Sequence, residues 1–145
     1  MNRPDWNTYL INIAQAVSAR SIDPNTKVGC VLVDKKYSIL STGYNSPPRG
    51  IKDNEVPLVR PDKYDWIIHA EANAIANAAR VGTSLDECIS YSTHRPCSSC
   101  LKLLISAGCK KIIFKPTKYE MMDTDADWHL MSRICKEAGI ELTEL

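Results

Sequence analysis

The chain has 145 residues, of which 44% are hydrophobic and 24% charged, and its formal net charge is +1. This composition is typical of a globular protein, and the length suits a single domain, which we expect to cover residues 1–145. The near-neutral charge argues against a nucleic-acid polymer as partner, because domains that bind one usually carry a basic stripe. Residues 1–5 have no apolar signal core and no stretch is long enough to span a bilayer, so we expect no membrane partner.

The N-terminal segment is predicted to be an amphipathic helix. Asp5 is placed to cap it, and the helix should end near residues 19–21, before the turn residues 23–25. Apolar residues recur in it at helical spacing and are expected to form one stripe that faces the core: Trp6, Leu10, Ile13 and Val17.

A β-hairpin and a long loop follow. Residues 28–33 form an apolar run rich in β-branched side chains, and residues 38–44 form its return strand. Residues 46–66 contain four prolines and no clear period, which predicts a long loop with a functional role. The loop has no Cys or His, so we expect no second zinc site there. Three apolar residues in it are candidates for an interface or an effector pocket: Ile51, Val56 and Leu58.

The remaining elements alternate between helix and strand. Their expected ranges are helix 70–79 closed by residues 81–82, strand 88–93, helix 97–107 stopped by Gly108, strand 112–114, a helix from Asp123 or Thr124 to Gly139, and strand 140–143. In the last helix the inward residues should be Trp128, Met131, Ile134 and Cys135. The order αββαβαβαβ predicts an α/β fold, a three-layer α-β-α sandwich with a five-stranded mixed sheet whose last three strands are parallel.

Five residues form one chemical pattern: His69, Glu71, Pro96, Cys97 and Cys100. One imidazole and two thiolates make three zinc ligands, which leaves a fourth position open for catalytic water. The pattern H-x-E with P-C-x-x-C is a signature of zinc-dependent deamination of bases. Glu71 is about 200° around its helix from His69, so we expect it beside the metal as a proton carrier. The backbone N–H of Cys97 is a candidate to hold developing charge.

Two other readings of the cysteines remain open. A C-x-x-C pair can be a redox pair or half of a structural zinc site. A structural site would need a fourth ligand, and His94 is the nearest spare. The remaining cysteines are expected to be core residues rather than disulfides, because no secretory signal precedes them: Cys30, Cys88, Cys109 and Cys135.

With these motifs placed, the sequence resembles the cytidine and deoxycytidylate deaminase superfamily, and within it the deoxycytidylate (dCMP) deaminases. The resemblance covers nearly the whole chain and includes residues 19–29, 43–45, 69–75 and 118–119. It departs from the family pattern at Ser46, where Gly usually follows Gly-Tyr-Asn, and at residues 93–95.

This resemblance implies a zinc-dependent hydrolysis of dCMP to dUMP and ammonia, which would feed thymidylate synthesis. It implies one catalytic zinc per chain and a cytoplasmic homo-hexamer. It also implies control by dCTP as activator and dTTP as inhibitor, with magnesium bound alongside the effector. Arg20, Lys27 and Arg95 are candidates for the 5′-phosphate, and Asn45 for the sugar or base. The other expected substrate contacts are Thr26, Ala70, Thr93 and Tyr119, while Asn73 is expected to brace the helix that carries Glu71.

Three alternative functions stay open. A tRNA adenosine deaminase would share the fold but needs a polyanionic partner. A free-nucleoside cytidine deaminase would lack the Arg-Ser-x-Asp-Pro start seen at residues 20–24. A zinc-stabilised binding module would need a closed, four-ligand metal and would have no use for Glu71.

Overall fold

The computed structural model describes residues 2–117 and 123–145. Its helices and strands follow the predicted order αββαβαβαβ, with ends within two residues of the expected ranges. The elements are α1 Trp6–Ser18, β1 Gly29–Val33, β2 Ile39–Tyr44, α2 Ala70–Val81, β3 Ile89–Ser92, α3 Ser98–Ala107, β4 Lys111–Phe114, α4 Asp125–Glu137 and β5 Glu141–Glu144. The long loop adds two short 3₁₀ helices, η1 Asp53–Glu55 and η2 Asp62–Asp65.

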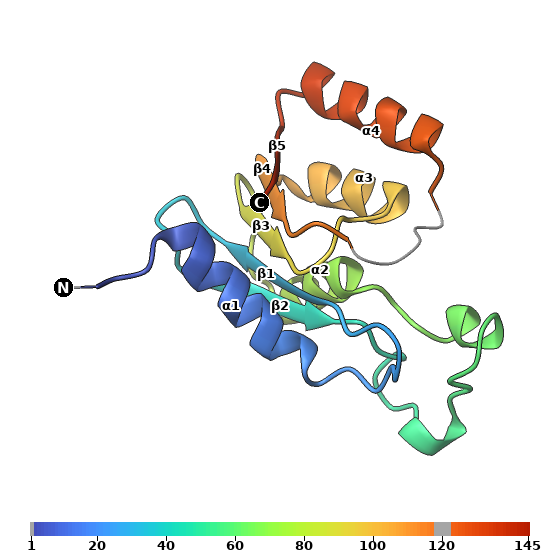
Figure 1. The fold of residues 1–145 in the computed structure, drawn as a ribbon. Helices are drawn as coiled ribbons and strands as arrows, with labels where there is room; N and C mark the ends of the chain where they lie inside the picture. Colours follow the sequence, from blue (N-terminus) through green and yellow to red (C-terminus); the bar gives the residue numbers. More distant parts are fainter. Residues whose placement is uncertain (1, 118–122) are drawn as a thin grey trace.

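The five strands form one mixed sheet in the order β2-β1-β3-β4-β5 (Figure 1). β1 is antiparallel to both β2 and β3, whereas β3, β4 and β5 are mutually parallel, as predicted. β2 and β3 therefore run in the same direction, and each is followed along the chain by a helix, α2 or α3. This topology starts both helices at the same edge of the sheet.

Side chains of β1 alternate between two hydrophobic clusters, which makes the fold three-layered. Val31 and Val33 pack with Leu10, Ile11 and Ala14 of α1 on one face. The other cluster joins Cys30 and Leu32 of the same strand to residues of α2, α3 and α4: Ala70, Ala74, Ala78, Leu101, Leu104, Met131 and Cys135. The helices thus cover both faces of the sheet, and the three-layer sandwich is confirmed (Figure 1).

The predicted core stripe of α1 is wrong at Trp6. Asp5 caps the helix as expected, its carboxylate accepting from the Thr8 N–H at 2.9 Å. The buried face, however, contains Leu10 with Ile11 and Ala14, while Ile13 and Val17 lie at its margin. Trp6 is 49% exposed and stacks on Tyr37 at 4.7 Å between ring centroids. The indole therefore packs against the turn between β1 and β2 instead of in the core.

The other cap and core predictions are confirmed, and the structure decides which residue caps α4. Thr124 rather than Asp123 caps α4, with its hydroxyl and the Asp127 side chain forming a reciprocal capping box. Gly82 and Gly108 end α2 and α3 in the left-handed conformation that glycine adopts without strain. The four cysteines assigned to the core are buried free thiols. Among the described residues, no helix is long and apolar enough to cross a bilayer.

Candidate metal centre and substrate pocket

The two helix starts carry the predicted metal ligands. His69 is the N-cap residue of α2, Cys97 is the N-cap residue of α3, and Cys100 lies in the first turn of α3. Neither His69 nor Cys97 uses its side chain to cap its own helix, so both side chains are directed elsewhere. The parallel course of β2 and β3 brings these two starts together from positions about thirty residues apart in the chain.

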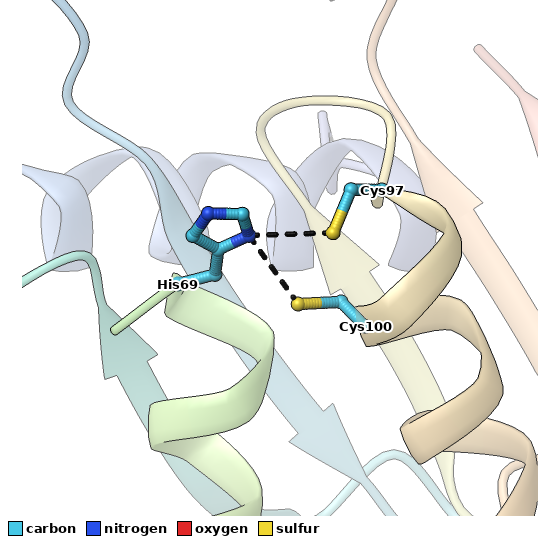
Figure 2. Close-up of side chains that lie close together, drawn as sticks. All are labelled: His69, Cys97 and Cys100. Carbon is cyan, nitrogen blue, oxygen red and sulfur yellow. Dashed lines mark hydrogen bonds between the residues drawn. The ribbon is translucent and has the colours of Figure 1, made fainter. Parts of the chain in front are cut away.

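The three side chains converge on one point (Figure 2). His69 Nδ1 lies 3.3 Å from Cys97 Sγ and 3.5 Å from Cys100 Sγ. Two ligands of a tetrahedral zinc at the usual bond lengths are about 3.6 Å apart, so this spacing fits zinc closely. Within the described residues the cluster has these three members only; His94 is not one of them, and its Nδ1 lies 3.0 Å from Thr93 Oγ1. Three ligands leave a coordination position for water or substrate.

The electrostatics of the cluster favour a thiolate. A hydrogen bond from Cys100 lowers the pKa of the Cys97 thiol to about 4, burial opposes this shift, and a hydrogen bond with His69 assists it. The pKa of Cys100 is raised by the same interaction with Cys97. The pKa of His69 is also raised, first by its hydrogen bond with Cys97 and against the effect of burial. A negative sulfur facing an imidazole is a donor set that a divalent soft metal prefers.

Glu71 lies beside this cluster in the first turn of α2 and is only 3% exposed. Burial raises the pKa of its carboxyl group above the usual value, and hydrogen bonds oppose the shift. A carboxyl group whose pKa is moved towards neutrality can both accept and release a proton. Its position next to three metal ligands therefore suits it to acid–base chemistry.

A pocket of about 540 Å³ opens over the cluster and is large enough for a nucleotide. His69, Glu71, Cys97 and Cys100 form part of its lining. The walls come from the loop after α1, from the segment around η2 and from the loop between β3 and α3.

The structure brings some of the predicted substrate residues to this pocket and leaves others away from it. Thr26, Asn45, Ala70 and Arg95 line the pocket. Arg20 instead lines a separate cavity of about 190 Å³, together with Ser46 and Arg49. Lys27 and Thr93 line neither cavity, and Thr93 Oγ1 accepts a hydrogen bond from the Gly29 N–H at 3.0 Å. Tyr119 lies outside the described residues.

Asn45 and Asn73 both brace the walls of the site. Asn45 Oδ1 accepts from the Val28 N–H and its Nδ2 donates to the Thr26 carbonyl, each at 2.8 Å. Asn73 Nδ2 donates to the Tyr44 carbonyl at 2.9 Å, which ties α2 to the end of β2. The bracing role expected for Asn73 is thus confirmed, and Asn45 combines a position in the pocket lining with a structural role.

Sequence reasoning missed several residues of this pocket. Lys63 and Arg60 come from the long loop, and Asp23 comes from the turn after α1. Asp123 also lines it and accepts hydrogen bonds from the N–H and hydroxyl of Ser98 at 2.8 and 3.3 Å, thereby fixing the start of α3. The length and prolines of the loop predicted a functional role, but without a periodic pattern they gave no sign of which of its residues face the pocket.

An open three-ligand zinc site with a buried carboxylate beside it is the arrangement of a zinc-dependent hydrolytic enzyme. The family described as "Cytidine and deoxycytidylate deaminase zinc-binding region" matches residues 4–115. This chain belongs to that family.

Several similar proteins are deoxycytidylate deaminases. Deoxycytidylate deaminase of Homo sapiens is 37% identical over 125 residues, which cover 82% of this chain and 69% of that protein. A probable deoxycytidylate deaminase of Caenorhabditis elegans is 41% identical over 115 residues, 77% of this chain and 57% of that protein. A crystal structure of dCMP deaminase from the cyanophage S-TIM5, in complex with dCMP and dUMP, matches all of this chain and all of its own with a TM-score of 0.76 and 26% identity.

The tRNA adenosine deaminases, one of the alternative functions considered from the sequence, are similar to this chain in fold. A structure from a study of tRNA:A34 deaminases, which edit adenosine to inosine, matches 97% of this chain with a TM-score of 0.63 but is 16% identical. That similarity extends to the architecture and gives no support for an RNA substrate.

Proposed function

We propose that this chain is a zinc-dependent deaminase that hydrolyses dCMP to dUMP and ammonia, with residues 1–145 acting as one catalytic domain. The observation that carries the proposal is the convergence of His69, Cys97 and Cys100 beside the buried Glu71, in the lining of a nucleotide-sized pocket. The full-length similarity to a dCMP deaminase solved with dCMP and dUMP supports the choice of substrate.

The chain's own groups account for the acid–base steps. His69, Cys97 and Cys100 would hold a zinc ion, which would act as a Lewis acid and make water nucleophilic near neutral pH. Glu71 accepts the proton that this water loses on attack at the ring carbon bearing the amino group. Glu71 delivers this proton to the ring nitrogen. It then takes the remaining proton from the added hydroxyl as the ring carbonyl forms, and passes it to the amine, whose bond to the ring carbon breaks to release ammonia. The N-terminus of α3, including the Cys97 N–H, stabilises the negative charge that develops on the reacting atoms during hydrolysis.

Recognition of the nucleotide falls to the pocket walls. Thr26, Asn45 and Ala70 line the pocket together with Glu71, which supports a role for them in contacting the base or sugar. Arg95 is a candidate for the 5′-phosphate because it lines the pocket and its buried Nε has no hydrogen-bond partner within the described residues. Its guanidinium group lies 4.2 Å above the Trp128 ring, which holds it in place. Arg20, Lys27, Thr93 and Tyr119 remain substrate contacts proposed from the family resemblance.

Regulation and assembly are proposed on the same basis. A homo-hexamer controlled by dCTP and dTTP with magnesium, located in the cytoplasm and supplying dUMP for thymidylate synthesis, is what the family resemblance implies. The separate cavity lined by Arg20, Ser46 and Arg49 offers a second polar site in which an effector can be sought.

Ammonia release from dCMP, deoxycytidine and tRNA, measured at equal enzyme, tests the function. We expect turnover of dCMP to exceed that of the other two. A preference for tRNA or for the nucleoside would replace the proposal by one of those activities. Absence of any turnover, together with a four-ligand metal by X-ray absorption spectroscopy, would make the chain a zinc-stabilised binding module.

A further inference from the structure

A buried ion pair joins two walls of the substrate pocket. Lys63 Nζ donates to Asp23 Oδ2 at 2.8 Å, and the two side chains are only 3% and 6% exposed. Lysine and aspartate are rarely buried to this degree unless paired, because each charge loses its hydration. Both residues line the pocket, although they are 40 positions apart in the chain. The ion pair is therefore a long-range contact that links the turn after α1 to the long loop.

On one side the pair fixes the turn that leads into β1. The other carboxylate oxygen of Asp23 accepts from the N–H groups of Asn25 and Thr26 at 2.9 and 3.1 Å. Asn45 holds the next residues, as described above. Because both carboxylate oxygens of Asp23 are hydrogen-bonded, its side chain is held in one position, and it in turn fixes the Lys63 ammonium group.

On the other side Lys63 is the centre of the η2 turn. Its N–H donates to the Val59 carbonyl, and its own carbonyl accepts from the N–H groups of Trp66 and Ile67, all at 3.1 Å. The position of the Lys63 ammonium group therefore sets the position of residues 59–67. This segment lies in the extended connection between β2 and α2, which Figure 1 shows projecting from the sheet.

The same turn presents Arg60 and Tyr64 to the pocket. The Arg60 guanidinium carbon lies 5.9 Å from the centre of the Tyr64 ring, and Lys63 Nζ lies 5.7 Å from the same centre. In the part of the chain that the structure describes, Arg60 forms no ion pair, whereas Lys63 is bound to Asp23. Arg60 thus brings a positive charge to the pocket that no described carboxylate neutralises, and guanidinium groups bind phosphate with two parallel hydrogen bonds.

We propose that the Asp23–Lys63 pair is a positioning device that holds Arg60 at the pocket, where Arg60 binds the 5′-phosphate and distinguishes a nucleotide from a nucleoside. The proposal rests on the proposed function and adds two features to it. Arg60 becomes the residue that selects for the phosphate. Lys63, although it is also a cation in the pocket lining, acts only by holding the turn that carries Arg60.

The test compares ligands with and without the phosphate. Dissociation constants for dUMP and deoxyuridine are measured by calorimetry, and kcat and KM for dCMP are measured alongside. In Arg60→Ala the preference for dUMP over deoxyuridine should fall roughly tenfold or more, the effect of losing a phosphate contact, and KM should rise more than kcat falls. Arg133→Ala, which removes an exposed guanidinium on α4, is the matched control and should keep the preference of the original chain.

The pair is tested by the double variant Asp23→Asn, Lys63→Met. Replacing both members of a buried ion pair with neutral residues is often tolerated, whereas removing one leaves a buried charge unpaired, so the double variant should fold even where single ones do not. We expect it to lose preference for dUMP to an extent similar to Arg60→Ala, with its zinc content unchanged. Adding Arg60→Ala to the double variant should then cause little further loss.

Two results would overturn the inference. One is an unchanged preference for dUMP in Arg60→Ala, and the other is an equal weakening of dUMP and deoxyuridine binding in the double variant. Failure of the unaltered chain to deaminate dCMP would instead refute the proposed function, so the two failures are distinguishable.

Discussion

The backbone of Gly43 in β2 lies directly against the backbone of Ala74 in α2. A Cβ atom on Gly43 would overlap the Ala74 nitrogen and the Ala70 carbonyl oxygen. Side chains reinforce this close approach, because Ser41 Oγ donates to the Ala74 carbonyl at 2.7 Å and Asn77 Nδ2 to the Thr42 carbonyl at 2.8 Å. The height of α2 above the sheet, and with it the position of His69 and Glu71, is fixed by these contacts.

Gly43→Ala should therefore destabilise the protein and weaken its zinc site. Because the new methyl group meets backbone atoms, α2 must shift, and we expect a loss of about 3 kcal/mol, the upper end for overpacking. Urea unfolding and zinc content measure the two effects. Gly139→Ala is the control, since nothing lies within 4 Å of its added Cβ and its φ of +71° leaves only local strain of about 1 kcal/mol. Equal stability losses in the two variants would contradict the packing argument.

Glu71→Gln should retain zinc and lose turnover. The amide has nearly the shape of the carboxyl group but cannot take a proton from water, so kcat should fall by a factor of about 10² to 10⁴. The zinc-to-protein ratio should stay the same because Glu71 is not a member of the ligand cluster. Glu87→Gln, at an exposed surface ion pair, serves as the control and should keep normal kcat. Normal turnover in Glu71→Gln would exclude the proton-carrier role.

Cys97→Ser should release zinc, whereas Cys135→Ser should not. Loss of one of three ligands should weaken zinc binding by more than about 100-fold, because even the partners that orient ligands contribute 10- to 100-fold. Cys135 is a buried thiol of α4 outside the cluster, so its replacement affects only packing. Chelator competition with a colorimetric zinc indicator measures both. Equal zinc affinity in the two variants would show that the metal is held elsewhere.

Asp23→Asn should reduce stability in a way that depends on pH. Burial alone would raise the pKa of the Asp23 carboxyl group, but hydrogen bonds from Lys63, Asn25 and Thr26 outweigh it and hold the pKa below 3.8. A depressed pKa in the folded state stabilises the protein at pH values above 3.8, and this contribution is lost as the pH falls through the folded-state value. The difference in unfolding free energy from the original chain should be about 3 kcal/mol at pH 7.

That difference is measured by urea unfolding of both proteins at a series of pH values between 7 and about 2.5. It should remain constant down to about pH 5 and shrink below pH 3.8, where the unfolded chain takes up a proton first. A difference that is unchanged at the lowest pH, or one that grows with acid, would show that the Asp23 charge does not stabilise the fold.

The sequence predicted the clustering of His69, Cys97 and Cys100 and the mixed sheet because both depend on local patterns. The spacing of His69, Cys97 and Cys100 and the alternation of helices with strands follow short-range rules, and the resulting topology places the ligands together. Glu71 was predicted for the same reason, since its proposed role as a proton carrier follows from its offset from His69.

Long-range contacts account for what the sequence did not predict. Lys63 looks like an ordinary surface lysine in the sequence, and its burial depends on Asp23, forty residues earlier. Arg20 is close in sequence to Asp23 yet lines a different cavity, because the chain turns between them. The side on which an exposed charge finally lies depends on loop paths, which no periodicity encodes.

The metal-ligand cluster lies at helix starts, whereas much of the pocket wall lies in loops, and this separation has a practical consequence. The groups proposed to perform the chemistry lie at the starts of α2 and α3, whereas much of the pocket wall belongs to turns such as the one that carries Arg60. A protein engineer can therefore exchange that turn to admit a different cytosine compound while leaving the reactive centre intact.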